Sequence, residues 1–140
     1  MIIMSLDIGL ARTGIALCDE SETLAFPKGV IKEYNFERLL EKICTIASEN
    51  SVRLIVVGHP KNMDGSEGER ALACAKAAKE IELKSKIKTV LWDERRTTVT
   101  AQNILSMNKK YGRKRKESID MVAATVILES YLSARKNGSV

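Results

Sequence analysis

The apolar run at residues 53–58, which ends in Gly58, most constrains the fold of this chain. Its apolar residues are continuous and do not alternate with polar ones, which predicts a strand that is buried on both faces. Strands of that kind occur in sheets that helices cover on both sides. The run is far shorter than the roughly 18 apolar residues of a transmembrane helix. It therefore predicts an α/β protein without a membrane span.

Turn residues and apolar spacing divide the rest of the chain into strands and helices. Further strands are expected at Ile2–Asp7, Thr13–Asp19, Ala25–Lys32 and Ile87–Asp93. Helices are expected at Phe36–Glu49 with Asn35 as N-cap, from a Ser66–Glu69 capping box to about Leu83, from Thr97 or Thr98 to about Met107, and from about Ser118 to Arg135. Strand and helix alternate after the third strand, which requires crossover connections. We therefore expect the first, fourth and fifth strands to be parallel neighbours, with the second and third antiparallel to them and helices on both faces.

The length and the charge of the chain bound its organisation. At 140 residues it has the size of one domain, and we expect a single domain over residues 1–140. The net charge of +5 comes from one octet without acids, whose basic residues are Lys109, Lys110, Arg113, Lys114, Arg115 and Lys116. Without these six charges the chain would carry −1. Such a cluster is typical of a site for nucleic-acid phosphates, although a solvated loop can have the same composition.

The cysteines and the first residues indicate the compartment. Cys18, Cys44 and Cys74 are widely spaced and form no C-x-x-C pair, which is typical of buried thiols in a reducing environment. The first residues have no basic segment and reach Asp7 early, so no signal peptide is expected. We therefore expect a cytoplasmic protein.

Acidic residues stand at the carboxyl ends of the strands that should be parallel. Asp7 ends the first strand, Asp93 and Glu94 end the fifth, and Asp120 lies in the first turn of the last helix. Open α/β sheets bind ligands at this edge. Clustered carboxylates there would suit Mg²⁺ or Mn²⁺ ions and metal-assisted phosphodiester hydrolysis. Taken singly, Asp93 could instead cap a helix or bind Arg95, and Asp120 could be an ordinary first-turn aspartate.

Several residues beside these acids are candidates for holding substrate phosphate. Arg12 and Arg95 either bind phosphate or neutralise the carboxylates. Lys61, Asn62 and Arg70 belong to a loop that leads into a helix N-terminus, which favours an anion. The same loop composition also suits a turn that is built for backbone reasons alone.

Two further residues have a ring that could take part in binding or chemistry. His59, the only histidine, precedes a proline and has no evident nucleophile beside it, so a structural role is favoured over catalysis. Tyr111 lies within the basic octet and could stack on a base.

Four segments spread over most of the chain carry a family resemblance. They are LDIG with RTGIA near the N-terminus, VGHPKNMDGSEGERA from residue 57, DERRTT from residue 93, and the pairs ID, AA and IL of the last helix. These segments resemble the YqgF (RuvX-like) family of bacterial RNase H-fold proteins. The second segment is long and specific.

The resemblance implies an RNase H-like fold with a mixed five-stranded sheet of order 3-2-1-4-5, in which the second strand is antiparallel. It implies a cytoplasmic bacterial nuclease that matures the 5′ end of pre-16S ribosomal RNA, or, by an older proposal, a Holliday-junction resolvase. Asp7, Glu94 and Asp120 would be the metal-binding acids, with Asp93 as the rival of Glu94. The wider resolvase group tends to have a carboxylate at the end of strand four, where this chain has Gly58 and His59.

Two other classes of function remain open at this point. The D-x-G-x-x-x-x-G turn also resembles the phosphate loop of actin-like and sugar-kinase folds, but those enzymes close two lobes and this length supplies one. A non-catalytic nucleic-acid-binding or ribosome-associated module could keep the same acids for structure. The resemblance alone favours structured RNA over branched DNA, and either a monomer or a homodimer is compatible with the sequence.

Overall fold

The computed structural model describes residues 1–96, 115–138 and 140 of the chain. The strands are β1 (Ile2–Ile8), β2 (Arg12–Cys18), β3 (Ala25–Lys32), β4 (Val52–His59) and β5 (Lys88–Asp93). The helices are α1 (Phe36–Glu49), α2 (Glu69–Ser85), the 3₁₀ turn η1 (Glu94–Arg96) and α4 (Arg115–Lys136). The helix expected from Thr97 or Thr98 lies outside the described residues, as do Lys109, Lys110, Tyr111, Arg113 and Lys114. Arg115 and Lys116 are the first residues of α4, which begins earlier than expected.

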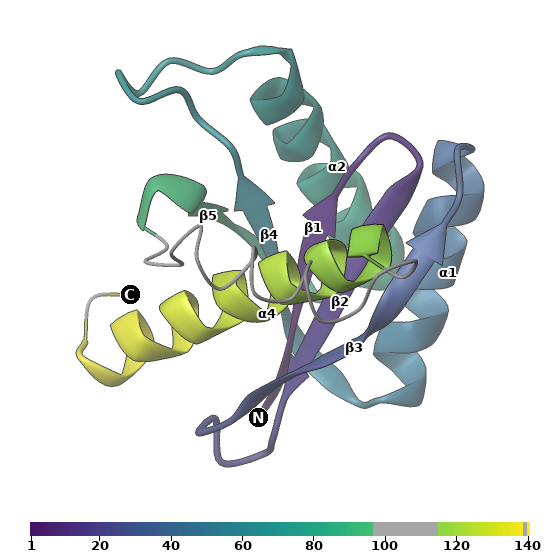
Figure 1. Cartoon of the computed structure of the whole chain (residues 1–140). Helices are drawn as coiled ribbons and strands as arrows, with labels where there is room; N and C mark the ends of the chain where they lie inside the picture. Colours follow the sequence, from purple (N-terminus) through teal and green to yellow (C-terminus); the bar gives the residue numbers. More distant parts are fainter. Residues whose placement is uncertain (97–114, 139) are drawn as a thin grey trace.

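The five strands form one sheet in the order β3-β2-β1-β4-β5 (Figure 1). β1 is antiparallel to β2 and parallel to β4, and β4 is parallel to β5. The expected order and the antiparallel second strand are confirmed. β2 is also antiparallel to β3, so β3 runs in the same direction as β1. The expectation that the third strand opposes the parallel strands is therefore wrong, because two successive hairpin turns reverse the chain twice.

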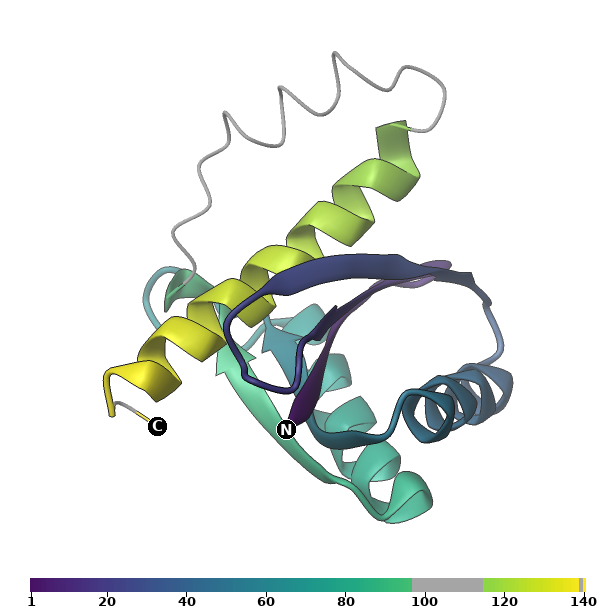
Figure 2. The ribbon, with the colours of Figure 1, turned by 90° about the horizontal axis from the view of Figure 1, so that it is seen from below.

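Helices cover both faces of the sheet, as expected. Figure 2 shows α4 on one side and α1 with α2 on the other. Among the described residues, no helix has the length and apolar character needed to cross a membrane.

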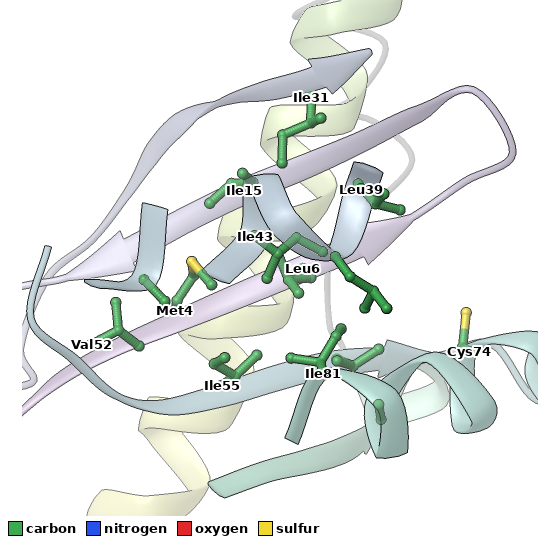
Figure 3. Packing of buried hydrophobic residues seen from close by; sticks show 14 of the residues in the cluster. Met4, Leu6, Ile15, Ile31, Leu39, Ile43, Val52, Ile55, Cys74 and Ile81 are labelled. Carbon is green, nitrogen blue, oxygen red and sulfur yellow. The ribbon is translucent and has the colours of Figure 1, made fainter. Parts of the chain in front are cut away.

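Residues of β4 reach both cores, which explains the continuous apolar run. Ile55 and Val57 belong to the cluster under α1 and α2, which Figure 3 shows in part. Leu54 and Val56 belong to the cluster under α4. Because side chains alternate along a strand, both faces of β4 must be apolar for both cores to form.

The N-terminus of α1 is fixed by Asn35. Its side-chain Oδ1 accepts a hydrogen bond from the Arg38 backbone N–H at 3.0 Å, which satisfies one of the amides that a helix leaves unpaired. We expect Asn35→Ala to lower the free energy of unfolding by about 1 kcal/mol, measured by urea denaturation. Asn35→Ser should keep most of that stability because serine is also a good N-cap. Equal stability of the alanine variant and the wild type would contradict a capping role.

The N-terminus of α2 differs from the expected capping box. The helix begins at Glu69 with Gly68 as N-cap, and no side chain caps it. The Ser66 hydroxyl instead donates to Asp64 Oδ1 at 2.6 Å and accepts from Asn62 Nδ2 at 2.9 Å. The capping-box prediction is wrong because partners within the preceding loop already occupy the serine hydroxyl.

Candidate active site

Asp7 lies near the carboxyl end of β1, opposite Gly14 of β2. Its side chain is only 13% exposed. Nη2 of Arg70, in the first turn of α2, lies 3.3 Å from Asp7 Oδ1. Burial raises the pKa of the Asp7 carboxyl, the Arg70 guanidinium acts against that rise, and the Asp120 carboxylate adds to it. Asp7 is therefore a desolvated acid, and it lies close enough to Asp120 for the negative charge of that residue to raise its pKa.

Glu94 follows β5 directly and turns its carboxylate over the end of β4. A Cβ atom placed on Gly58 would lie 2.6 Å from Ile127 Cδ1 and 3.2 Å from Glu94 Oε2, so the missing side chain at Gly58 leaves room for both the isoleucine of α4 and this carboxylate. The pKa of Glu94 is raised, chiefly by burial and next by the charge of Asp7, while Arg70 opposes the rise. The glycine that stands where the wider resolvase group tends to have an acid thus accommodates the acid that β5 supplies.

Asp93, the rival of Glu94, has a different environment. The Arg95 backbone N–H donates to Asp93 Oδ1 at 2.9 Å, and Arg95 Nη2 lies 2.6 Å from Asp93 Oδ2. These contacts with Arg95 lower the pKa of Asp93 to about 2. The two neighbouring acids therefore have different partners. Glu94 interacts with Asp7, and Asp93 is bound by Arg95.

Asp120 reaches the same edge because α4 crosses β2 at Gly14. A Cβ atom at Gly14 would lie 2.6 Å from the carbonyl carbon of Asp120, so only glycine admits the helix backbone at this distance. The buried Ser5 hydroxyl donates to the Ala124 carbonyl oxygen at 2.6 Å and fixes the helix one turn further on. Arg12 Nε donates to Asp120 Oδ2 at 3.0 Å.

The glycines of this site are the residues that sequence reasoning missed. Gly14 and Gly58 both lie inside strands, where glycine weakens a strand unless another group approaches closely. A glycine within a predicted strand can be recognised in the sequence, but the sequence does not show which group approaches the glycine.

The loop between β4 and α2 is tied together by its own polar residues. The Asn62 backbone N–H donates to the Ser66 carbonyl oxygen at 2.9 Å, and Gly65 has the left-handed φ of 89° that favours glycine. Met63 extends from this loop with 88% of its surface exposed. The Asn62 side chain is thus used by the turn, whereas Lys61 lies close enough to Asp93 to lower the pKa of that acid further.

His59 is buried at the end of β4. Its ring Nε2 lies 3.3 Å from Glu67 Oε2 in the loop that leads to α2. The contact connects the strand to the loop, which is the kind of structural role expected for this histidine.

The donor set of Asp7, Glu94 and Asp120 has the chemistry of a Mg²⁺ or Mn²⁺ site. In the described part of the chain, no three acidic, histidine or cysteine side chains lie in the arrangement of a single-ion site. Magnesium requires fewer, because it usually binds one or two carboxylates and completes its shell with water and phosphate oxygens. The charge of Asp120 raises the pKa of Asp7, and the charge of Asp7 raises the pKa of Glu94, so the three acids lie near one another. The residues present therefore fit hard divalent ions.

Comparison with known proteins gives agreement over nearly the whole chain. The model of the family RuvX, described as Holliday junction resolvase, matches residues 1–134. A Thermoanaerobacter pseudethanolicus protein, whose name describes a proposed pre-16S rRNA nuclease, is 40% identical over 138 residues, covering 98% of this chain and 99% of the relative. A Lachnospira eligens protein with the same name is 41% identical over 139 residues, covering 97% of this chain and 99% of the relative.

Solved structures agree on the fold. RuvC of Thermus thermophilus in complex with a Holliday junction substrate has a TM-score of 0.63 at 11% identity, covering 98% of this chain and 96% of the other. The fowlpox virus resolvase in complex with Holliday junction DNA has a TM-score of 0.58 at 14% identity, covering 96% and 99%. At these identities the likeness shows the fold alone, and it confirms the expected RNase H-like architecture.

Proposed function

Since the chain belongs to the RuvX family, we propose that it is a nuclease that hydrolyses phosphodiester bonds at the 5′ end of pre-16S ribosomal RNA in the bacterial cytoplasm. The family and the names of the relatives support the reaction class and this substrate. The observation that carries the proposal is the gathering of three acids from separate elements, in which the largely buried Asp7 side chain lies near enough to Glu94 and Asp120 for their charges to act on one another. Such a cluster is costly to bury unless cations or hydrogen bonds compensate it.

Asp7, Glu94 and Asp120 are the residues that would hold divalent cations. Bound Mg²⁺ or Mn²⁺ would supply water activation and charge stabilisation for the leaving oxygen. Arg70 and Arg12 currently neutralise Asp7 and Asp120, and the cations would replace them in that role. The two guanidinium groups would bind substrate phosphate oxygens, for which their paired N–H donors are suited. The basic octet, Lys109–Lys116, remains a predicted further contact to phosphate.

The proposal assigns the metal-binding role to Glu94 and a different role to Asp93. Asp93 would position Arg95, whose Nη1 also lies 3.4 Å from the Met63 carbonyl oxygen in the neighbouring loop. We expect Glu94→Gln to lower the cleavage rate at least about 100-fold, since a lost cation ligand removes several kcal/mol of transition-state stabilisation. Asp93→Asn should lower it less than about 10-fold, because it only weakens the hold on Arg95. Both rates are measured under single-turnover conditions. If Asp93→Asn lowers the rate more than Glu94→Gln does, Asp93 and not Glu94 is the metal-binding acid.

The function is tested with purified protein and two substrates. An RNA that carries the 5′ precursor end should be cleaved with Mg²⁺ or Mn²⁺ and left intact after chelation. A four-way DNA junction is the second substrate, because the family description names junction resolution. Cleavage of the junction but not the RNA would establish resolution instead, and cleavage of neither would reject the nuclease. The mass in solution adds a check, since a strict monomer does not present two sites to a two-fold junction.

A further inference from the structure

A cleft of about 600 Å³ lies beside the candidate active site. Its walls are formed by residues from the turn after β1, the link between β3 and α1, and the first turns of α2. Leu39 and Cys74 line it and also belong to the core cluster of Figure 3, so the packed interior forms its floor. Its volume is within the range of small-ligand sites.

The mouth of the cleft has large exposed apolar side chains. Leu10 is 93% exposed, Tyr34 is 84% exposed and Phe36 is 38% exposed, and all three line the cleft. Large apolar groups around a hollow are typical of a binding site, because exposure to water is unfavourable for them. A flat ring that stacked on Tyr34 would cover this surface.

The cleft is continuous with the site through Arg70. This arginine lines the cleft and contacts Asp7, and Ile8, the residue after Asp7, lines the cleft as well. A nucleotide whose phosphate lies at Asp7 and Arg70 therefore has this cleft within reach of its base.

The charges in the cleft favour a base over a phosphate. Arg70 lies where the cleft meets Asp7 and would attract a phosphate there, whereas Glu33 and Glu69 also line the cleft and would repel a phosphate that entered it. Carboxylate oxygens accept hydrogen bonds, and the exocyclic amino groups of adenine, cytosine and guanine donate them. Glu33 is held in place because its Oε1 lies 3.0 Å from Lys42 Nζ and its Oε2 accepts from the Asn35 N–H at 3.2 Å.

We propose that this cleft binds one unpaired nucleobase of the RNA next to the scissile phosphate, stacked on Tyr34. The inference rests on the proposed nuclease function and defines its substrate as single-stranded at that nucleotide. A paired base cannot enter the cleft without leaving its helix, which costs a few kcal/mol.

The test uses short single-stranded RNAs that span the precursor 5′ junction, with 2-aminopurine at each position in turn. Binding is measured in the Asp7→Asn background, which prevents cleavage. We expect the 2-aminopurine fluorescence to be quenched at one position and this quenching to be lost in Tyr34→Ala. The same variant should bind the RNA about 5- to 100-fold more weakly, which is the range for a lost stacking contact. Tyr34→Phe keeps the ring and should bind like the parent. Phe26→Ala removes an exposed aromatic from the far end of β3 and is the matched control.

A second measurement assigns the effect to the base. An abasic nucleotide at the quenched position should weaken binding to the parent protein and cause no further loss in Tyr34→Ala, because both changes remove the same contact. Additive losses, or quenching that persists in Tyr34→Ala, would overturn the inference.

The outcome is separable from that of the nuclease proposal. If the wild type cleaves the RNA and Tyr34→Ala cleaves and binds equally well, the cleft is not a base site but the nuclease stands. If base binding depends on Tyr34 and no metal supports cleavage, the base site stands and the nuclease fails.

Discussion

Asp7→Asn is expected to abolish metal-dependent cleavage, with a loss of at least about 100-fold in the single-turnover rate. Asp7 lies near enough to both Glu94 and Asp120 for their charges to act on one another, so its neutralisation removes a proposed cation ligand that is central to the three acids. Asparagine has nearly the same size, so the change tests charge and not packing. Glu41→Gln, an exposed acid on α1, is the matched control and should leave the rate unchanged.

The stability of the same variant shows whether a loss of activity comes from unfolding. The raised pKa of Asp7 means that its ionised form is less favourable in the folded protein than in the unfolded chain. This acid therefore favours folding at low pH, and its contribution is lost as the pH rises through the raised pKa. Asp7→Asn should unfold at the same or a higher urea concentration at neutral pH, and the difference should shrink below the ordinary aspartate pKa. The loss of the contact between Asp7 and the exposed Arg70 side chain should change the free energy of unfolding little.

An inactive Asp7→Asn variant that also unfolds at much lower urea would contradict this interpretation, because the acid would then have a structural role. Wild-type rates in a folded Asp7→Asn variant would reject Asp7 as a metal-binding acid. The two results are obtained from one protein preparation.

Gly14→Ala is expected to have the largest effect on stability, lowering the free energy of unfolding by about 3 kcal/mol. The new Cβ atom would overlap the backbone of Asp120, and a backbone cannot move aside as a flexible side chain can. α4 would have to shift away from β2 and carry Asp120 with it. Since small displacements of reacting groups are costly, cleavage should fall about 100-fold in the molecules that remain folded.

Gly29→Ala is the matched control for this prediction. Gly29 lies in β3, and a Cβ atom there would meet no other atom within 4 Å. Its replacement should leave urea denaturation unchanged or raise the midpoint slightly, because alanine loses less backbone entropy on folding than glycine. Equal effects of the two substitutions would show that α4 does not depend on the close contact at Gly14.

Much of the fold could be predicted because local patterns specify it. The spacing of Leu39, Leu40, Ile43 and Ala47 predicts α1, and these residues are the buried ones. The strand order came from the family resemblance, and the direction of β3 was predicted wrongly from the residues. The capping box failed because the Ser66 hydroxyl has partners within its own loop.

The candidate site was predictable as a set of acids but not as an arrangement. Strand ends placed Asp7 and the pair Asp93 and Glu94 at one edge of the sheet, as the parallel strands require. The sequence could not distinguish the two neighbouring acids, since each could turn either way after β5. The contacts of Asp93 with Arg95 and the space above Gly58 distinguish them.

The amino-acid sequence by itself determined the α/β class, the edge of the sheet at which acids gather, and the family, because each depends on residue type and spacing along the chain. Tertiary structure alone decided which carboxylates interact, why Gly14 and Gly58 are glycines, and where the cleft beside Arg70 lies. Those properties depend on distances between segments that are far apart in sequence, and such distances exist only after α4 and β5 have packed against the sheet.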